Sequence, residues 1–228
     1  GCVCGELRYT SAAQNPAGKG EGLYWRYERF LKRRESLLGS ALGANGSIYA
    51  VRRPLFVELD PDIISDFIMP IRIRRAGYRV VYQPAAVAVE GAGNSFQDEF
   101  RRRARIISRS AYGLWTERGV LNPFRHGLFA VQMLSHKVLR WLVPVHLLVL
   151  LATSALLAGL PWFRAALLAQ VAFYLLAGLG HAFQRGAGRL PPLYIPAYFC
   201  AINLGALVGL WGFIRGRRYR VWQPVARA

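Results

Sequence analysis

The sequence WLVPVHLLVLLATSALLAGL occupies residues 141–160 and contains no Asp, Glu, Lys or Arg. Because an α-helix rises about 1.5 Å per residue, a stretch of about twenty such residues crosses a bilayer core of roughly 30 Å. Two further apolar stretches follow, over residues 165–183 and 196–214, and the loops that join the three are short and aromatic or basic. Three such stretches in succession favour membrane spans over a buried helical core. We therefore predict a transmembrane domain over residues 141–228, with spans at 141–160, 165–183 and 196–214 and a basic tail.

The charged residues divide the chain into two parts. All twelve Asp and Glu residues lie between Glu6 and Glu117, whereas the thirty Lys and Arg residues continue to the tail and give a net charge of +18. Such a charge could attract nucleic acid. Lys and Arg also accumulate at the cytoplasmic flanks of membrane spans, where anionic headgroups attract them. We therefore predict a lipid bilayer and no nucleic acid as a partner, a multi-pass location in the inner (plasma) membrane, and a cytoplasmic first part.

The first 120 residues are predicted to form a mixed α/β domain. Strands are expected over residues 3–9, 47–52, 78–83 and 86–90, with Pro84 as a break between the last two. Helices are expected over residues 22–38 and 66–76, and a third helix should run from a capping box at Ser95 and Asp98 to about Arg118. The small residues of 11–20 predict a loop. Within the first helix, Glu28 and Lys32 have the spacing of a supporting ion pair.

Residues 121–140 are predicted to form an amphipathic helix between the two parts. Apolar residues recur at helical spacing, and the other face is polar or basic. The apolar set is Phe124, Leu128, Val131, Leu134 and Val138. This pattern is typical of a helix that lies in the membrane interface, although an amphipathic helix packed on protein has the same pattern.

Any carboxylate that acts as a base must be one of the twelve acidic residues, and Asp66 has the most distinctive setting among them. It follows Ser65 at the expected N-terminus of a helix, where the helix dipole and free N–H groups stabilise the ionised form. An ionised carboxylate at the end of a loop can act as a general base. The alternative is a simple helix N-cap.

A second candidate is the run of arginines at Arg101, Arg102, Arg103 and Arg105. On a helix, Arg102, Arg105 and Arg109 share one face, and Arg103 lies at the edge of the apolar face. A row of guanidinium groups suits a diphosphate, which accepts paired hydrogen bonds. A solvated or headgroup-facing stripe is the alternative.

No metal site is predicted within the chain. Cys2, Cys4 and Cys200 have no second Cys or His pair to complete a zinc site, so we expect reduced thiols. Asp60-Pro61-Asp62 has the form of a metal-nucleotide motif, but it lies too close to Asp66 to leave room for a nucleotide-binding half.

Several segments, in order along the chain, resemble the second half of membrane-bound family-2 glycosyltransferases, which include cellulose-synthase-like and poly-N-acetylglucosamine synthases. Asn45-Gly46-Ser47 resembles the segment beside the acceptor site, and Ser65-Asp66 occupies the place of the Thr-Glu-Asp motif. Arg102-Arg103-Ala104-Arg105-Ile106 lies where Gln-Arg-x-Arg-Trp belongs, and residues 135–141 resemble the passage into the membrane. The resemblance implies the second half of a GT-A-type domain followed by about three transmembrane helices.

The resemblance also implies an activity: inverting transfer of a hexosyl group from a nucleotide sugar, a UDP-sugar above all, to a glycan or lipid-linked acceptor in exopolysaccharide or cell-envelope synthesis. Asp66 would be the base, and Arg102, Arg105 and Arg103 would steady the departing diphosphate. Asn45, Gly46, Ser47 and Ile106 would line the acceptor side.

The resemblance places the metal site outside this sequence. In this family the D-x-D motif, which would hold Mg²⁺ or Mn²⁺, precedes the matching segment, so we expect it upstream of Gly1. We therefore expect this chain to be the carboxy-terminal portion of a longer protein, without the donor-binding half and inactive alone.

Two departures from the family pattern affect the predicted specificity. The aromatic residue that stacks on the acceptor sugar in processive synthases is Ile106 here, so transfer of a single sugar to a lipid-linked acceptor is an alternative to polymerisation. Ser65 replaces the acidic neighbour of the base.

A non-enzymatic alternative is a basic membrane-surface module that binds anionic lipids through its arginine stripe. The membrane topology also stays open, because three spans would place the basic residues Arg215 and Arg217 opposite the cytoplasmic first part, against the positive-inside rule. Either the tail is an exception or one stretch is re-entrant, and the prolines at 191, 192 and 196 point to the third stretch.

Overall fold

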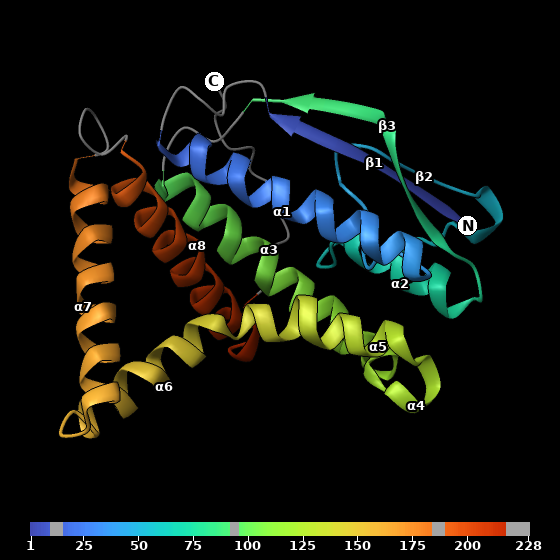
Figure 1. Cartoon of the computed structure of the whole chain (residues 1–228). Helices are drawn as coiled ribbons and strands as arrows, with labels where there is room; N and C mark the ends of the chain where they lie inside the picture. The colour runs from blue at the N-terminus through green and yellow to red at the C-terminus, as the bar shows by residue number, and fades with distance from the viewer. Residues whose placement is uncertain (10–15, 92–95, 184–189, 218–228) are drawn as a thin grey trace.

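A computed structural model of the chain describes residues 1–9, 16–91, 96–183 and 190–217. The expected loop over residues 11–20 and the capping residue Ser95 lie partly or wholly outside the described residues. The fold is mixed, with a small sheet, long helices and apolar helices at one end (Figure 1). The predicted mixed α/β class with a helical C-terminal segment is thereby confirmed at this coarse level.

The sheet has three strands in the order β2-β1-β3. The central strand β1 (Cys2–Tyr9) pairs antiparallel with β2 (Tyr49–Val51) and parallel with β3 (Val80–Glu90). Opposite β1, the pairing moves from Tyr82 beside Cys4 to Val87 beside Glu6. Pro84 lies in this irregular stretch and has no N–H to give to a ladder, so it produces a bulge. The prediction of two separate strands was therefore wrong.

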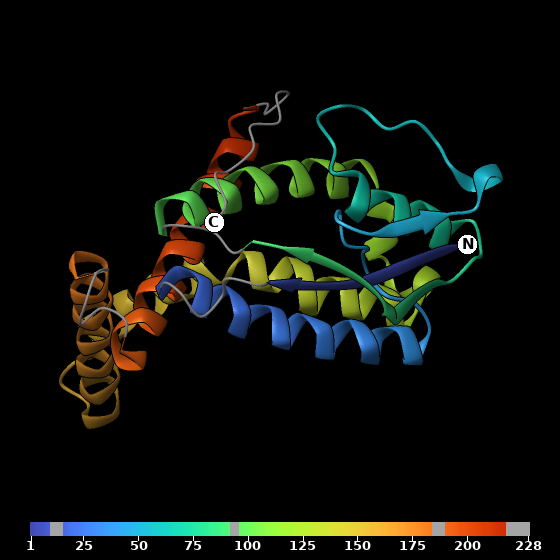
Figure 2. The ribbon, with the colours of Figure 1, turned by 90° about the horizontal axis from the view of Figure 1, so that it is seen from above.

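Three helices accompany the sheet. Helix α1 (Pro16–Leu38) and helix α3 (Phe96–Thr116) lie on the same side of it in Figure 1, and the β1–β3 ribbon lies over the space between them when seen from above in Figure 2. Helix α2 (Ser65–Arg75) follows a loop that contains the short 3-10 helix η1 (Arg53–Leu55). Proline favours the first turn of a helix, which explains why α1 begins at Pro16 rather than near residue 22.

The segment between the two parts is not one amphipathic helix, and that prediction was wrong. It divides into η2 (Arg118–Leu121), α4 (Pro123–His126), α5 (Leu128–Met133) and a π-helical turn, η3 (Leu134–Leu139). Gly127 has φ +54° between α4 and α5, a conformation that breaks a regular helix. Apolar residues lie on both sides of this segment: Phe129, Ala130 and Met133 are buried, whereas Phe124, Leu128 and Val131 of the predicted apolar set are exposed.

The apolar C-terminal region contains α6 (Val143–Leu156), α7 (Pro161–Ala182) and α8 (Pro191–Ile214). Only α7 and α8 are long and apolar enough to cross a membrane among the described helices, and this indicates association with a membrane. Helix α6 has 14 residues, or about 21 Å, and bends by 61° from the preceding segment, so the two together form a broken span or a re-entrant loop. The expected continuous span over residues 141–160 is thus broken, and the third stretch, suspected of re-entry, is one continuous helix through Pro196.

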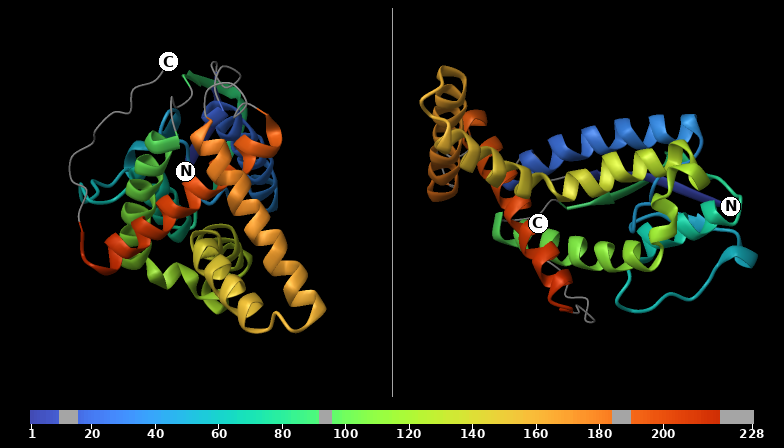
Figure 3. Two further views of the ribbon diagram at one scale, coloured as in Figure 1. Left: turned by 90° about the vertical axis from the view of Figure 1, so that its left-hand side faces the viewer. Right: turned by 90° about the horizontal axis from the view of Figure 1, so that it is seen from below.

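Helix α8 packs along α3 and does not stand apart from the α/β part, whereas α6 and α7 extend from its end (Figures 1 and 3). The main hydrophobic core joins α2, α3 and α5 to α8, with Phe67 edge-on to Trp141. A Cβ at Gly205 would lie 2.7 Å from the Phe100 carbonyl oxygen, so this close packing requires glycine.

Candidate functional site

A cavity of about 820 Å³ lies between α1, α3, the loop after α1, the start of α2 and η3. Leu7 of β1 and Glu90 of β3 also line it. Every residue predicted to act in the site from the sequence lines this one cavity: Asp66, Arg102, Arg103, Arg105, Asn45, Gly46, Ser47 and Ile106. The fold thus brings together residues up to 61 positions apart in the chain, from Asn45 to Ile106.

Asp66 is the second residue of α2, and its carboxylate turns away from the helix toward the Asn45–Ser47 loop. The N-cap position belongs to Ile64 and has no side-chain capping bond, so Asp66 is not a simple N-cap. The backbone N–H of Gly46 donates to the Asp66 carboxylate, and the N–H of Ala44 donates to the Asp66 carbonyl at 2.7 Å. A Cβ at Gly46 would lie 3.0 Å from Asp66 Oδ2, and this explains why the loop has glycine here.

The electrostatic environment of Asp66 is unusual among the acidic residues. Burial raises the pKa of Asp66, and the ammonium groups of Lys32 and Lys137 and the Gly46 hydrogen bond oppose the increase. Among the residues that the structure describes, no Lys or Arg nitrogen lies within 4 Å of the carboxylate. The buried carboxylates of Glu6, Glu28, Glu99 and Glu117, by contrast, all form ion pairs with arginine, and Glu35 contacts the ring of His136. Asp66 is thus a partly desolvated carboxylate that is free to accept a proton.

The basic wall of the cavity also includes residues that the sequence did not identify. Lys32 is buried and donates to the carbonyl oxygens of Gly43 and Ala44, both at 2.9 Å, and so holds the loop beside Asp66. Glu28 pairs with Arg140 at 2.5 Å and not with Lys32, so the predicted pair within the helix is wrong. Burial alone would raise the pKa of Glu28, but Lys137, Arg140 and Lys32 lower it below its usual range.

These side chains could not be found from local spacing. The helical interval of four between Tyr24, Glu28 and Lys32 was visible, and it places the three on one face of α1. Whether that face meets solvent or a second basic segment depends on the packing of α1 against η3, which is a long-range contact.

The arginines of α3 divide into two groups by their partners. Arg102 pairs with the buried Glu99 at 2.6 Å, and Arg103 lies 3.4 Å from Glu99 with its guanidinium 4.7 Å from the centre of the Tyr24 ring. Both are thereby held at the wall of the cavity. Burial and then the neighbouring Arg109 and Arg102 lower the pKa of Arg105, and a bound anion would relieve this repulsion.

Arg109 has a structural role in this arrangement. Its guanidinium donates to the carbonyl oxygens of Pro61 and Ile63 at 2.7 and 2.9 Å and fixes the loop before α2. The predicted face of Arg102, Arg105 and Arg109 therefore contributes an anchor as well as cavity-lining cations.

The residues predicted to lie on the acceptor side are Asn45, Gly46, Ser47 and Ile106, and two of them are held by contacts to the sheet. Asn45 Nδ2 donates to the Gly5 carbonyl at 2.5 Å, and the Ser47 hydroxyl donates to Glu90 at the end of β3. Ile106 is partly buried at the cavity wall, between the arginines of α3. The wall at this point is aliphatic, without an aromatic ring from α3.

No metal ligand set is present among the described residues, since none of their His, Cys, Asp and Glu side chains form a group of three. Asp60 accepts the backbone N–H of Asp62 at 2.7 Å, so the Asp60-Pro61-Asp62 turn is closed on itself. Cys2 and Cys4 are buried in the sheet, and burial raises the pKa of both thiols, to about 11 for Cys2.

Gly1, upstream of which the D-x-D motif is expected, does not line the Asp66 cavity. Its backbone nitrogen donates to the carbonyl oxygen of Arg79 at 3.0 Å, just before β3, and its carbonyl oxygen accepts the N–H of Arg52. A Cβ at Gly1 would lie 2.7 Å from Cγ2 of Ile73, so the residue is packed against α2. Gly1 therefore lies at the start of the central strand and not in the site, and the upstream D-x-D stays a prediction.

No protein-family model matches the chain, and no curated protein matches it. The resemblance to family-2 glycosyltransferases therefore depends on the residues themselves.

Proposed function

We propose that this chain is the acceptor-side part of an inverting glycosyltransferase of the membrane-bound family-2 type, with a GT-A-type catalytic domain. It would move a hexosyl group from a nucleotide-diphospho-sugar, such as a UDP-sugar, to a glycan or lipid-linked acceptor in exopolysaccharide or cell-envelope synthesis. One observation supports this above all: the cavity that holds the unpaired carboxylate of Asp66 also holds Arg102, Arg103 and Arg105. A base and a cluster of cations on one cavity are what this transfer requires.

In the proposed reaction, an acceptor hydroxyl oxygen attacks the anomeric carbon of the donor and forms the new C–O bond. Its proton passes to the carboxylate of Asp66, whose raised pKa suits it to accept a proton as the bond forms. The bond from the anomeric carbon to the diphosphate oxygen breaks, and its electron pair leaves with the diphosphate. Arg102, Arg103 and Arg105 would stabilise the charge that develops there.

A divalent metal, Mg²⁺ or Mn²⁺, is expected for such a donor. The described residues do not fit one, because Asp60 is used in a turn and Asp66 has no second carboxylate beside it. The proposed steps of this chain are therefore restricted to base catalysis and diphosphate binding.

The proposal places the cavity at the cytoplasmic face of the inner (plasma) membrane, where nucleotide sugars are found. By length and composition α7 and α8 can each cross a membrane, and two such spans would return the chain to the side from which it started. This arrangement would put Arg215 and Arg217 beside the α/β part and would agree with the positive-inside rule. The aliphatic side chain of Ile106 favours transfer of one sugar over polymerisation, since no ring stacks on a growing chain from this position.

The test is sugar transfer by the full-length gene product in isolated membranes, measured with a panel of labelled UDP-sugars. Asp66→Asn keeps the size of the side chain and removes the base, so we expect transfer to fall by about 10²-fold to 10⁴-fold while the protein still inserts in the membrane. Glu58→Gln, at an exposed position off the cavity, is the matched control and keeps full activity. Normal turnover by Asp66→Asn would remove Asp66 from the mechanism.

A non-enzymatic module that binds anionic lipids is the competing function, and one observation favours it. Phe124 is 98% exposed, and Leu128 and Val131 are about half exposed beside Arg125, as in a membrane-surface helix. The module predicts that Arg102→Ala weakens binding to anionic vesicles as much as Arg125→Ala does. The transferase predicts that Arg102→Ala abolishes transfer and leaves vesicle binding unchanged.

A further inference from the structure

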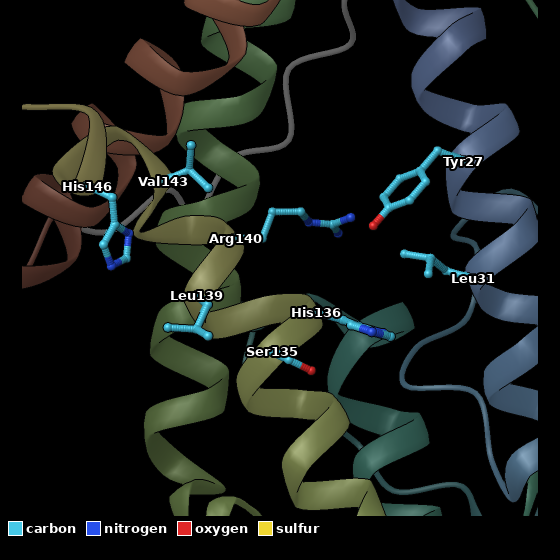
Figure 4. A pocket seen from close by; sticks show the side chains of 8 residues that line it. All are labelled: Tyr27, Leu31, Ser135, His136, Leu139, Arg140, Val143 and His146. Carbon is cyan, nitrogen blue, oxygen red and sulfur yellow. The ribbon is translucent and has the colours of Figure 1, made fainter. Parts of the chain in front are cut away.

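A second cavity of about 460 Å³ forms an open groove between α1 and the junction of η3 with α6. Figure 4 shows its lining: Tyr27 and Leu31 from α1, and Ser135, His136, Leu139, Arg140, Val143 and His146 from the opposite side. The groove lies where the chain bends by 61° into α6, so it opens beside the apolar C-terminal helices.

The lining of the groove combines apolar walls with cations. Tyr27, Leu31, Leu139 and Val143 provide hydrocarbon and aromatic surface, while Arg140 extends between the two walls toward Tyr27 (Figure 4). Such a lining suits an amphiphile with a hydrocarbon chain and an anionic group.

The groove and the Asp66 cavity are neighbours that share one lining residue, Arg140. Its guanidinium pairs with Glu28 and lies 5.7 Å from the centre of the Tyr24 ring, which also contacts Arg103. A molecule that occupied both cavities would therefore contact Arg140.

Lys137 of η3 lies about one turn before Arg140 and lines the reaction cavity. It differs from the cations around it in its contacts. Its ammonium group lies 6.0 Å from the centre of the Phe67 ring, next to Asp66 in the sequence. Within the described ranges, no hydrogen bond or ion pair of this ammonium is present. Its neighbours Arg140, Arg102 and Lys32, by contrast, contact carboxylates or carbonyl oxygens.

The carboxylates around Lys137 act on it without pairing with it. Among them Glu28 has the largest electrostatic effect on the Lys137 ammonium, followed by Glu35 and Asp66. Within the described part of the chain, however, Glu28 pairs with Arg140, Glu35 contacts His136, and no carboxylate oxygen lies within 4 Å of this ammonium. A partly buried cation without an adjacent anion is costly, and a bound phosphate would provide one.

We propose that the acceptor is a lipid-linked sugar phosphate: its hydrocarbon chain lies in the groove, its phosphate binds Lys137 beside Arg140, and its sugar hydroxyl reaches Asp66. This inference depends on the proposed transferase function and names the acceptor class for the same site. The order of the three sites, from the apolar helices inward, is the order of chain, phosphate and sugar in such a molecule. Lys137 is a binding residue in this scheme, and Asp66 remains the base.

The experiment measures binding of farnesyl phosphate to the full chain in neutral-detergent micelles, with farnesol and inorganic phosphate as separate arms. We expect farnesyl phosphate to bind at least about tenfold more tightly than either, because only it engages both the groove and a charge-assisted contact. Lys137→Met should lose this advantage, Lys137→Arg should restore most of it, and Leu31→Trp should weaken binding by filling the groove.

Arg125→Met is the matched control, since it removes one exposed positive charge away from both cavities, and it should bind as the wild type does. Each variant is also melted, so that loss of binding is compared only among folded proteins. Wild-type binding by Lys137→Met, or equal binding of farnesol, would overturn the proposal. Full competition by phosphatidylglycerol vesicles would also overturn it, because it would indicate general binding of anionic lipid.

The two proposals fail separately in these measurements. If Asp66→Asn abolishes transfer but Lys137→Met binds farnesyl phosphate normally, the acceptor assignment is wrong and the transferase stands. If farnesyl phosphate binding depends on Lys137 but no UDP-sugar is transferred in a manner that depends on Asp66, the transferase assignment is wrong.

Discussion

Replacement of Gly209 by alanine tests whether α8 packs closely against α3, the helix that carries Arg102, Arg103 and Arg105. A Cβ at Gly209 would lie 2.5 Å from the carbonyl oxygen of Ala104 and 3.0 Å from Cβ of Ile107, where ordinary contacts begin at 3.4 Å. Both atoms belong to α3, whose backbone cannot give way as the end of a flexible side chain can. The two helices must therefore separate by about 1 Å, and interiors packed at this density resist such a change.

The size of the effect follows from a matched substitution. Gly178 lies on α7 and has no atom within 4 Å of a Cβ, so Gly178→Ala gains the helix preference of alanine, about 1 kcal/mol, without a clash. Gly209→Ala has the same gain but adds an overpacking cost of about 1–3 kcal/mol. The difference between the variants isolates the clash. For a chain of this length it corresponds to a melting temperature about 2–12 °C lower for Gly209→Ala.

The same movement should reach the proposed reaction. Ala104 stands between Arg103 and Arg105 on α3, so separation of the helices displaces the cations that line the cavity. A misplacement of about 1 Å can cost about 10²-fold in rate. Melting is followed by tryptophan fluorescence in detergent, and transfer is measured in membranes. Equal melting temperatures for Gly209→Ala and Gly178→Ala would refute the packing of α8 on α3, and with it this coupling.

Three further predictions concern charge and topology. Burial raises the pKa of Asp66, so the folded protein holds this proton to higher pH than the unfolded chain does. Ionisation of Asp66 therefore lowers the stability of the folded protein above about pH 4. Asp66→Asn removes this cost, so the variant should melt at a higher temperature than the wild type at pH 8 but not at pH 3. Glu99 is 3% exposed and pairs with two arginines, so Glu99→Ala should destabilise the protein by about 3–5 kcal/mol in denaturant unfolding, a value that an exposed pair would not reach. With Cys200 replaced by serine, Arg215→Cys and Tyr78→Cys should react with an impermeant maleimide from the same side of sealed vesicles, whereas labelling from opposite sides would indicate three full spans.

The local features of this protein could be predicted from the sequence. Hydropathy alone identified the apolar helices, because a helix long enough to span a bilayer needs only a run of uncharged residues. Helical spacing placed Arg102 and Arg105 together, and the residues before an apolar helix marked Asp66. Such features depend on neighbours within about one turn of the chain, so tertiary contacts need not be known.

The tertiary structure decided which of these features meet. Glu28 pairs with Arg140 rather than with Lys32, because α1 packs against η3, and Lys137 reaches the Asp66 cavity for the same reason. β3 continues past Pro84 as one strand with a bulge, because β1 pairs with β3 both before and after this proline. The first apolar stretch is bent before α6, whereas the third stretch continues as one helix through its prolines. Partners more than a hundred residues apart are chosen by shape and burial over the whole fold, and no local pattern in the sequence records that choice.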